Sequence, residues 1–460
     1  MIKNHDELHE ECGVVAIWGD DNAAQLTYYG LHSLQHRGQE AAGIVVRNNK
    51  KKLNIHKGEG LVSEVFDKEK IKKLSGNAAI GHVRYSTAGG GGIMNVQPFL
   101  FRTLDGMMGI AHNGNIVNAN SLKKELEENG SIFNSTSDTE VLGHLIKRET
   151  GRFVDRICKS LEKIDGAFAF VILVEDALYV ARDRYGLRPL SMGRLPSGGY
   201  MFSSETCALD IAGAEYVRDV EPGEIIRVKD GIIKSKKYTE ALPICNKLCA
   251  MEYIYFSRPD SNLDGINVHT ARKTCGKTLF EEAPVEADLV IGVPDSSISA
   301  AIGYSEASGI PYEMGLIKNK YVGRTFIQPT QEMRERGVRM KLSAVSSIVK
   351  GKRVIMIDDS IVRGTTSKRI VKLLKEAGAT EVHVRIASPA IKFPCFYGVD
   401  ISTLEELISH RMNVEELCQF IEADSLAFIS MEGLKKSVKH DMDGNCDLCM
   451  SCFSGNYVTK

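Results

Sequence analysis

The chain has 460 residues, which at ~150 residues per domain predicts two or three folding units. Lys plus Arg number 58 and Asp plus Glu number 59, so the formal net charge is -1, which excludes the broadly basic surface typical of nucleic-acid-binding proteins. With 43% hydrophobic residues and no apolar run near the ~20 residues of a membrane helix, the composition predicts a globular protein that spans no membrane.

The first half of the chain predicts sheets with helices packed on them. Residues 1–11 are acidic and contain no apolar core, so we expect no secretory signal and a cytoplasmic location. Apolar alternation and helical spacing then predict the following elements in chain order: a strand at 12–18, a helix at 23–34, strands at 80–85 and 109–112 that enter Gly/Asn turns, helices at 138–148 and 153–164, and strands at 168–174 and 178–182.

The pattern changes after residues 225–237. Beyond about Glu286, strands alternate with helices: strands are predicted at 288–293, 354–357 and 381–387, and helices at 296–308 and 366–377, the last one ended by Gly378. Such alternation is typical of a parallel sheet with right-handed crossovers. We therefore predict one domain at 12–240 and a second at 241–460.

Cys12 is the first candidate for chemistry, although by itself it indicates no more than a free thiol at the edge of a strand. Three segments downstream change that interpretation: LQHRGQEAAG at 34–43, GHVRYSTAG at 81–89 and AHNGN at 111–115, followed by SDTE at 137–140. Together with Cys-Gly-Val-Val, these segments resemble the N-terminal-nucleophile glutamine amidotransferases. The resemblance implies an αββα sandwich for the first half of the chain.

The resemblance also implies that the mature chain starts at Cys12, so residues 1–11 would be a propeptide. A free α-amine has a pKa of ~7.7–8.0 and can serve as the base for the thiol of its own residue. Attack on the side-chain amide of glutamine then produces an oxyanion, a thioester and ammonia, and water releases glutamate. The resemblance also implies the remaining roles. Asn113 and Gly114 form the oxyanion hole, Arg84 binds the carboxylate of glutamine, Asp138 binds its ammonium group, and Arg37 supports the glutamine site.

A second candidate site lies at 354–366, with the sequence VIMIDDSIVRGTT. Asp358 and Asp359 follow a buried-type strand and precede a helix start, and ligands of open parallel sheets bind at the carboxyl ends of strands. The two carboxylates can hold ribose hydroxyls or hydrated Mg²⁺, and the amides of 364–367 can face a phosphate. An Asp pair alone also occurs in phosphoacceptor and nucleotide-hydrolysing domains, but the chain has no Walker A sequence.

This segment resembles the phosphoribosyl pyrophosphate signature of the type I phosphoribosyltransferases. GVPDSS at 292–297 matches a loop near pyrophosphate and metal, while KNKYVGRTFIQP at 318–329 and RMKLS at 339–343 match the mobile flap of that family. The resemblance implies Mg²⁺ contacts from Ser296, Asp358 and Asp359. It implies phosphoribosyl pyrophosphate contacts from Asp358, Asp359, Arg363, Gly364, Thr365, Thr366, Lys320, Arg324 and Lys341.

The C-terminal segment carries three cysteines, Cys446, Cys449 and Cys452, at the spacing common among iron–sulfur ligands. A zinc site and plain surface thiols are alternatives, although no second Cys-x-x-Cys pair completes a zinc ribbon.

Taken together, the two halves resemble the amidophosphoribosyltransferases, in the branch that has both a propeptide and a cluster. This resemblance implies a 4Fe-4S cluster on Cys249, Cys395, Cys449 and Cys452, with Cys446 as a spare. The implied reaction is glutamine plus phosphoribosyl pyrophosphate plus water to 5-phosphoribosylamine, pyrophosphate and glutamate, the first committed step of purine synthesis. Also implied are transfer of ammonia between the sites, inhibition by purine nucleotides, and a homotetramer.

Three other interpretations were compared with this one. A hexosamine or asparagine synthase shares the glutaminase half, but DDSIVRGTT at 358–366 argues against it. A repressor that senses phosphoribosyl pyrophosphate needs a basic DNA-binding domain, whereas this N-terminus is acidic. An inert iron–sulfur scaffold would consume no glutamine in response to phosphoribosyl pyrophosphate. The sequence therefore predicts a two-site enzyme.

Overall fold

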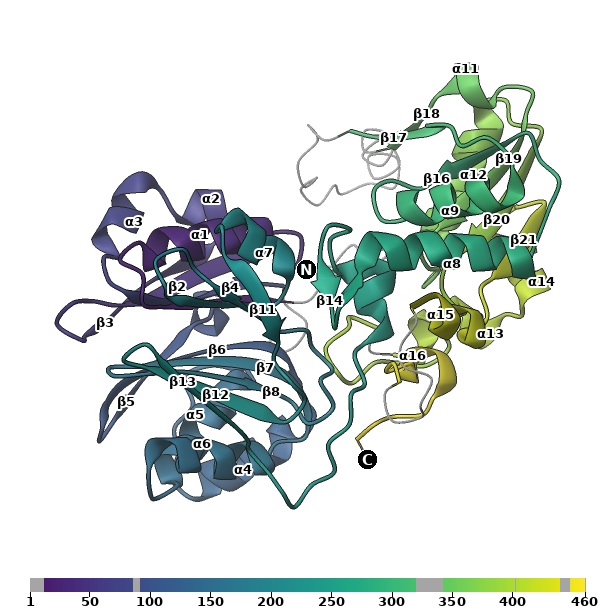
Figure 1. Ribbon diagram of the computed structural model, residues 1–460. Helices are drawn as coiled ribbons and strands as arrows, with labels where there is room; N and C mark the ends of the chain where they lie inside the picture. The colour runs from purple at the N-terminus through teal and green to yellow at the C-terminus, as the bar shows by residue number, and fades with distance from the viewer. Residues whose placement is uncertain (1–11, 86–91, 320–341, 402, 439–446, 460) are drawn as a thin grey trace.

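The computed structural model describes residues 12–85, 92–319, 342–401, 403–438 and 447–459. The first half of the chain forms two antiparallel sheets packed face to face, with helices on both outer faces (Figure 1). This helix–sheet–sheet–helix order is the αββα sandwich that the sequence predicts.

The upper sheet in Figure 1 has seven strands in the order β11-β9-β10-β1-β4-β2-β3. Its strands are β1 (Gly13–Trp18), β2 (Ala41–Arg47), β3 (Leu53–Glu59), β4 (Ala78–Arg84), β9 (Ser191–Arg194), β10 (Tyr200–Ser203) and β11 (Glu215–Asp219). The lower sheet has six strands in the order β13-β12-β8-β7-β6-β5. Its strands are β5 (Phe99–Thr103), β6 (Gly106–Ile116), β7 (Gly166–Val174), β8 (Leu178–Arg182), β12 (Glu224–Lys229) and β13 (Ile232–Lys237).

Three apolar layers hold these elements together. Alternate residues of β1 point to opposite faces, so Val15 and Ile17 pack under the upper helices while Val14 and Ala16 pack between the two sheets. The upper helices are α1 (Ala23–Ser33), α2 (Val62–Val65), α3 (Lys68–Lys73) and α7 (Thr206–Ile211), and the lower ones are α4 (Ala119–Glu128), α5 (Thr139–Arg148) and α6 (Phe153–Glu162). A short 3₁₀ turn, η1 (Ile93–Asn95), precedes β5.

The second half contains the predicted parallel sheet, in the order β16-β19-β20-β21. Val290 and Ile355 face α8, α9 and α15, while Ile291 and Met356 face α12, so both faces of the sheet are covered by helices and apolar side chains fill both layers. The strands are β16 (Leu289–Gly292), β19 (Arg353–Asp358), β20 (Glu381–Ile386) and β21 (Ser425–Phe428), and the longer helices are α8 (Val268–Glu282), α9 (Ile298–Ser308), α12 (Thr365–Glu376), α14 (Val414–Phe420) and α15 (Met431–Val438).

Short elements complete this half. They are the π turn η2 (Glu252–Phe256), the 3₁₀ turn η3 (Leu404–Glu406), the helices α11 (Ser346–Val349), α13 (Ile408–Arg411) and α16 (Ser451–Ser454), and the strand pairs β14 (Asn262–Leu263) with β15 (Ile266–Asn267) and β17 (Leu316–Lys318) with β18 (Leu342–Ala344).

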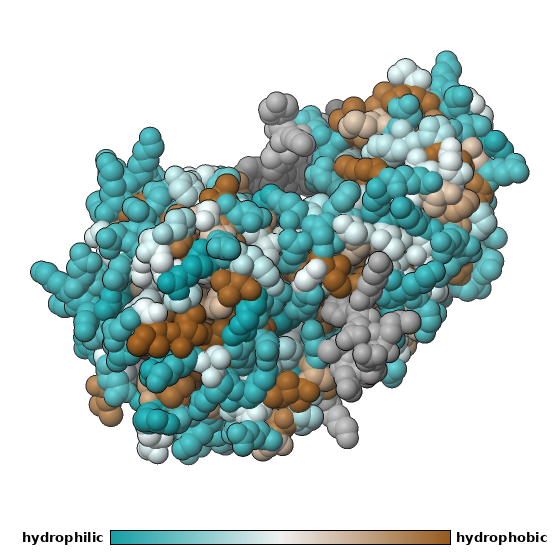
Figure 2. All heavy atoms as spheres, viewed as in Figure 1, coloured by the Kyte–Doolittle hydropathy of each residue, from teal (hydrophilic) through white to brown (hydrophobic). Residues whose placement is uncertain are grey.

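On the face shown in Figure 2, apolar side chains form separate patches among hydrophilic ones. Within the described ranges, no helix is both long and apolar enough to cross a bilayer.

Two differences from the predicted elements affect the sites. The strand predicted at 109–112 extends over Gly106–Ile116, because β7 pairs with it as far as Ile116. Asn113 and Gly114 therefore lie within a strand and not in a turn after it. The fifteen-residue helix α8 was not predicted: its mixed composition has no clear apolar stripe, and packing against α9 and α15 stabilises it.

Candidate active sites

Cys12 immediately precedes β1, which lies between β10 and β4 in the seven-stranded sheet. Its Sγ lies 3.6 Å from the carbonyl oxygen of Tyr85, at the end of β4. Burial raises the pKa of the Cys12 thiol to about 11, although the positive charge of Arg84 opposes this. The thiol in this environment is therefore protonated at neutral pH and needs a base before it can attack a substrate.

A single hydroxyl group connects Asn113 with β1, the strand that follows Cys12. Its Nδ2 lies 3.4 Å from Ser204 Oγ, which also accepts a hydrogen bond of 3.0 Å from Val14 N–H. Asn113 is completely buried, and its Oδ1 has no hydrogen-bond partner within the described residues. The backbone at Gly114 has φ of +140°, and a Cβ there would lie 2.1 Å from the carbonyl oxygen of Ala167, so only glycine fits.

Two charges of opposite sign lie near the Cys12 thiol. Arg84 ends β4, and its charge lowers the pKa of Cys12, whereas the charge of Asp138 raises it. Asp138 precedes helix α5, and its Oδ2 accepts a 2.8 Å hydrogen bond from Ile116 N–H on β6. Burial lowers the pKa of the adjacent His112, so its ring is neutral at physiological pH. The surroundings of the Cys12 thiol thus include a cation and a carboxylate.

Glu140 holds the segment that leads into Asp138. Its carboxylate accepts hydrogen bonds from the N–H groups of Asn134 (2.9 Å) and Ser135 (2.8 Å) and from the Ser135 hydroxyl (2.6 Å). Hydrogen bonds from His144 and Ser135 lower the pKa of Glu140 to about 2 against the opposing effect of burial. The carboxylate is therefore ionised at neutral pH and keeps the loop before α5 in place.

Arg37 lies behind Cys12 and is completely buried. Its Nε donates to the carbonyl oxygen of Cys12 at 3.3 Å, and its two amino groups donate to Glu205 at 2.6 Å and to Glu252 at 2.7 Å. The guanidinium is therefore engaged with two carboxylates and with the backbone of the nucleophile. Glu252 belongs to η2 in the second half of the chain, so this ion pair connects the two halves.

The second site forms where two parallel strands end side by side. Asp358 is the last residue of β19 and Asp359 follows it, while Ser296 lies in the loop after β16. The Ser296 hydroxyl donates to the Asp359 carboxylate, and Asp358 Oδ1 accepts from Asp359 N–H at 2.9 Å. The structure thus brings together the three residues predicted to contact metal. Their hydroxyl and carboxylate oxygens are the donors that Mg²⁺ prefers, so these residues fit that ion.

The segment that leads from Asp359 into α12 contains Arg363, Gly364, Thr365 and Thr366, four more of the predicted phosphate contacts. Gly364 has φ of +75° and forms the N-cap of α12, so Thr365 and Thr366 occupy the first turn of that helix. Arg363 forms an ion pair of 2.9 Å with Glu406. The three predicted flap residues, Lys320, Arg324 and Lys341, lie outside the described residues.

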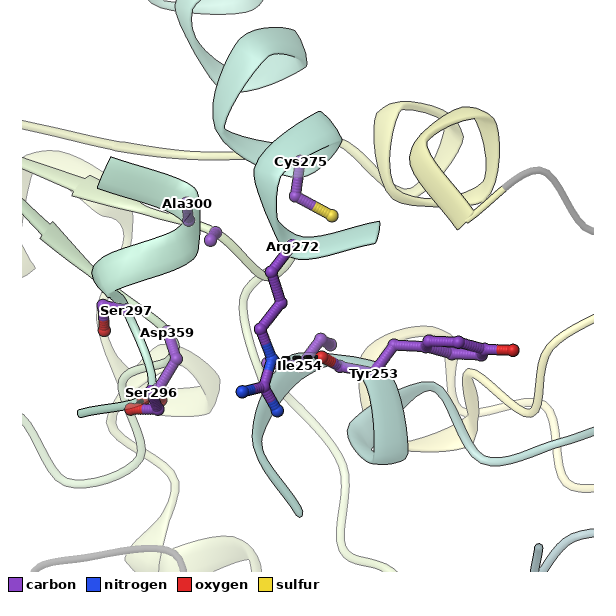
Figure 3. A pocket seen from close by; sticks show the side chains of 9 residues that line it. Tyr253, Ile254, Arg272, Cys275, Ser296, Ser297, Ala300 and Asp359 are labelled. Carbon is purple, nitrogen blue, oxygen red and sulfur yellow. Dashed lines mark hydrogen bonds between the residues drawn. The ribbon is translucent and has the colours of Figure 1, made fainter. Parts of the chain in front are cut away.

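A small cavity beside Asp359 contains a residue that the sequence analysis missed, Arg272 of α8. Figure 3 shows its guanidinium pointing toward Asp359 and Ser296. Arg272 Nε donates to the carbonyl of Tyr253 at 2.6 Å, and an amino group donates to that of Ser257 at 2.8 Å. Burial lowers the pKa of this guanidinium. No local signal distinguishes Arg272 from the other cations of its helix, because only the fold places it beside the cavity.

The four cysteines predicted as cluster ligands lie close enough together to influence one another's ionisation. Cys249 and Cys449 form a parallel bridge, and Tyr397 N–H donates to Cys395 Sγ at 3.3 Å. Burial raises the pKa of Cys249, and the negative charges that Cys449, Cys395 and Cys452 would carry raise it further. Cys446 lies outside the described residues. Over the described ranges, no group of three or more His, Cys, Asp or Glu is arranged as a single-ion site.

Two family models match the chain, a glutamine amidotransferase domain at residues 89–210 and a phosphoribosyl transferase domain at 270–389. The amidophosphoribosyltransferase of Bacillus subtilis is 61% identical over 100% of this chain and 96% of its own length, and that of Staphylococcus aureus strain Mu50 is 54% identical over 99% and 92%. The chain belongs to the amidophosphoribosyltransferase family.

A solved structure leads to the same assignment. Glutamine phosphoribosylpyrophosphate amidotransferase from Bacillus subtilis, complexed with ADP and GMP, superposes with a TM-score of 0.93 at 59% identity over 98% of both chains. Like other amidophosphoribosyltransferases, the chain uses glutamine and phosphoribosyl pyrophosphate to make 5-phosphoribosylamine, pyrophosphate and glutamate. The predicted fold class and reaction are confirmed.

Three charged residues around the two sites, Glu205, Glu252 and Arg188, were also missed by the sequence analysis. All three are completely buried and charged, and Arg188 contributes a further contact of 3.4 Å to Glu252. Single Glu and Arg residues are typical of solvated surfaces, so the printed sequence contains no signal for this network.

Proposed function

We propose that Cys12 is the nucleophile of the glutaminase site and that its own α-amine is the base. The amine takes the thiol proton while Sγ attacks the side-chain carbonyl carbon of glutamine. Asn113 Nδ2 and Gly114 N–H donate to the oxyanion, the carbon–nitrogen bond breaks, ammonia leaves, and water hydrolyses the thioester to glutamate. The observation that carries this proposal is the Ser204 hydroxyl, which joins Asn113 to β1, the strand that immediately follows Cys12.

In this mechanism Arg84 binds the α-carboxylate of glutamine and Asp138 binds its ammonium group. A guanidinium and a carboxylate at separate positions in one pocket match the two charges of an amino acid. Arg37 acts indirectly, because its hydrogen bond to the Cys12 carbonyl orients the nucleophile without leaving a free amino group for the substrate.

A free α-amine at Cys12 requires removal of residues 1–11. We expect the intact mass of purified active protein to correspond to residues 12–460, because a peptide nitrogen at Cys12 cannot accept the thiol proton. Mass spectrometry measures this directly, and glutamate release in the same sample serves as the activity control. Full glutamine turnover by a chain that still begins at Met1 would contradict the proposed base.

In the transferase site, Asp358, Asp359 and Ser296 would hold Mg²⁺, which neutralises charge on the leaving pyrophosphate when it is bound. The first turn of α12, with Gly364, Thr365 and Thr366, would face the 5-phosphate, since helix N-termini favour anions. Arg363, Lys320, Arg324 and Lys341 would add positive charge around the phosphates. Ammonia attacks C1 of the ribose as the bond between C1 and the pyrophosphate oxygen breaks.

Ammonia must reach the second site without protonation or escape. We propose that ammonia passes near η2, because residues in and next to this turn contact the surroundings of both sites. Glu252 of η2 binds Arg37 behind Cys12, and Arg272 binds the carbonyls of Tyr253 and Ser257 beside the cavity next to Asp359. We also propose that the boundary between the two domains lies near residue 240, in the segment between β13 and η2.

A 4Fe-4S cluster on Cys249, Cys395, Cys449 and Cys452 is the next part of the proposal. Four thiols that oppose each other's ionisation, three of them buried and Cys395 half-buried, fit this donor set, since a cluster stabilises them as thiolates. The cluster would connect the C-terminal segment to Cys249, next to η2. Bound zinc and free thiols are the alternatives, which metal analysis distinguishes.

Loss of the cluster is expected to destabilise the protein. We expect protein purified without oxygen to contain about four irons per chain, and air exposure or a chelator to lower its melting temperature. Cys449→Ser should abolish iron binding, whereas Cys418→Ser, a half-buried thiol on α14, should not. Superimposable melting curves with and without oxygen would contradict a structural cluster.

Three further properties follow from the resemblance to relatives. We propose that purine nucleotides inhibit the enzyme, as the nucleotides in the related Bacillus subtilis complex suggest. We also propose a homotetramer and a cytoplasmic location. Native mass spectrometry with and without nucleotide tests the assembly and its response.

A further inference from the structure

Lys57 lies on the inner face of the seven-stranded sheet, on the same side as Arg84. Gly43 of β2 pairs with Lys57 of β3 on one side and with His82 of β4 on the other, and directly paired residues share a face. Arg84 is two residues beyond His82 and therefore shares that face as well. His82 Nε2 lies 3.1 Å from the carbonyl of His112 on β6, so this face is turned toward the six-stranded sheet and the proposed oxyanion residues.

Gly43 leaves space between these side chains, because it has none of its own. The backbone carbonyl of Gln97 fills that space, and a Cβ on Gly43 would lie 2.2 Å from its oxygen. The Lys57 Nζ donates to the carbonyl of Val96 at 2.5 Å and lies 5.3 Å from the centre of the Phe99 ring. The ammonium is thus held against the chain segment that follows Arg84 in the sequence.

Lys57 is a half-buried cation without a carboxylate partner. Across the described residues it forms no ion pair, although most half-buried lysines of this chain do. Burial and the positive charge of Arg84 both lower the pKa of Lys57. Two like charges in a partly dry site repel each other, and a bound anion relieves that repulsion. His82 supplies no compensating charge, because burial lowers its pKa to about 3 and its ring is neutral.

We propose that Lys57 is a second cation of the glutamine site and binds the α-carboxylate of the substrate together with Arg84. This inference rests on the role of Arg84 proposed above. In this arrangement Arg84 on β4 supplies a planar guanidinium with two donors, and Lys57 on β3 supplies a compact ammonium charge from the same face of the sheet. The carboxylate of glutamine then interacts with both cations.

The test compares glutamine with 4-aminobutanamide, which is glutamine without its α-carboxylate. For Lys57→Met we expect kcat/KM for glutamine to fall about tenfold or more, because a charge-assisted hydrogen bond is lost. We expect little change in kcat/KM for 4-aminobutanamide and in the rate with free ammonia. Lys57→Arg should recover most of the glutamine activity. Lys70→Met is the matched control, since Lys70 Nζ also donates to a backbone carbonyl (Val65, 2.9 Å) but lies on the outer helix α3.

The results separate this inference from the proposed function. An equal loss with both substrates would mean that Lys57 only supports the fold, and an unchanged kcat/KM for glutamine would mean that it does not bind the carboxylate. Either result overturns the inference. If wild-type protein released no glutamate from glutamine, the proposed glutaminase site would be wrong, whatever the effect of Lys57→Met.

Discussion

Replacing Cys12 with alanine should abolish synthesis of 5-phosphoribosylamine from glutamine and leave synthesis from free ammonia close to the wild-type rate. The loss with glutamine should be at least about 10³-fold, because removal of a catalytic nucleophile leaves only binding and oxyanion stabilisation. The ammonia rate should persist, since Asp358 and Asp359 lie on a separate sheet in the second half of the chain. Steady-state rates with each nitrogen source, at saturating phosphoribosyl pyrophosphate, measure both effects.

Cys158→Ala provides the control for this experiment. Cys158 is another thiol of the first half, but it is buried on α6 in the outer helix layer. It should retain both activities within about twofold, apart from a modest loss of stability. Loss of both activities in Cys12→Ala would refute the division into two sites, whereas retained glutamine turnover would exclude Cys12 as the nucleophile.

Unlike Cys12→Ala, Asp359→Asn should reduce synthesis from both nitrogen sources, by about 10²–10³-fold. This carboxylate is 8% exposed and accepts hydrogen bonds from the Ser296 and Ser360 hydroxyls, so it is oriented at the end of β19. Removing its charge should weaken magnesium binding and the stabilisation of departing pyrophosphate. The apparent Mg²⁺ requirement should therefore rise in parallel with the loss of rate.

Asp288→Asn is the matched control at the opposite, N-terminal end of the same strands. Asp288 precedes β16, and its Oδ2 accepts a 2.8 Å hydrogen bond from Arg353 N–H at the start of β19. This variant should lose some stability but keep both activities and the Mg²⁺ dependence. If Asp359→Asn reduced only the glutamine-dependent rate, Asp359 would belong to coupling between the sites and not to the transferase reaction.

The two sites differ in how far local sequence could predict them. Around Asp358, the strand, the loop and the first turn of α12 are continuous in the chain, so a single segment contains most of the site. Ser296, a distant partner of Asp359, was found because GVPDSS is a second local motif. The glutaminase site is assembled from five separate segments, and only its resemblance to a family indicated which of their residues belong together.

Other features escaped sequence analysis for identifiable reasons. Asn113 and Gly114 were expected in a turn, but pairing with β7 extends β6 through them. Such pairing depends on a strand more than fifty residues away, which local propensity does not report. Lys57 has no motif at all, and its significance comes from the register that sets it beside Gly43 and on the face of Arg84.

By itself, the sequence determined the fold class of both halves, the family, and the residues that form each local motif, because apolar periodicity and strand–loop–helix segments are properties of neighbouring residues. Only the tertiary structure decided which charges meet. Arg37 and Glu252 are 215 positions apart and form a fully buried ion pair, and Arg272 lies beside Asp359 across a cavity. Burial makes such contacts strong and leaves no trace in the sequence, since an ionic side chain looks the same whether water or an opposite charge surrounds it.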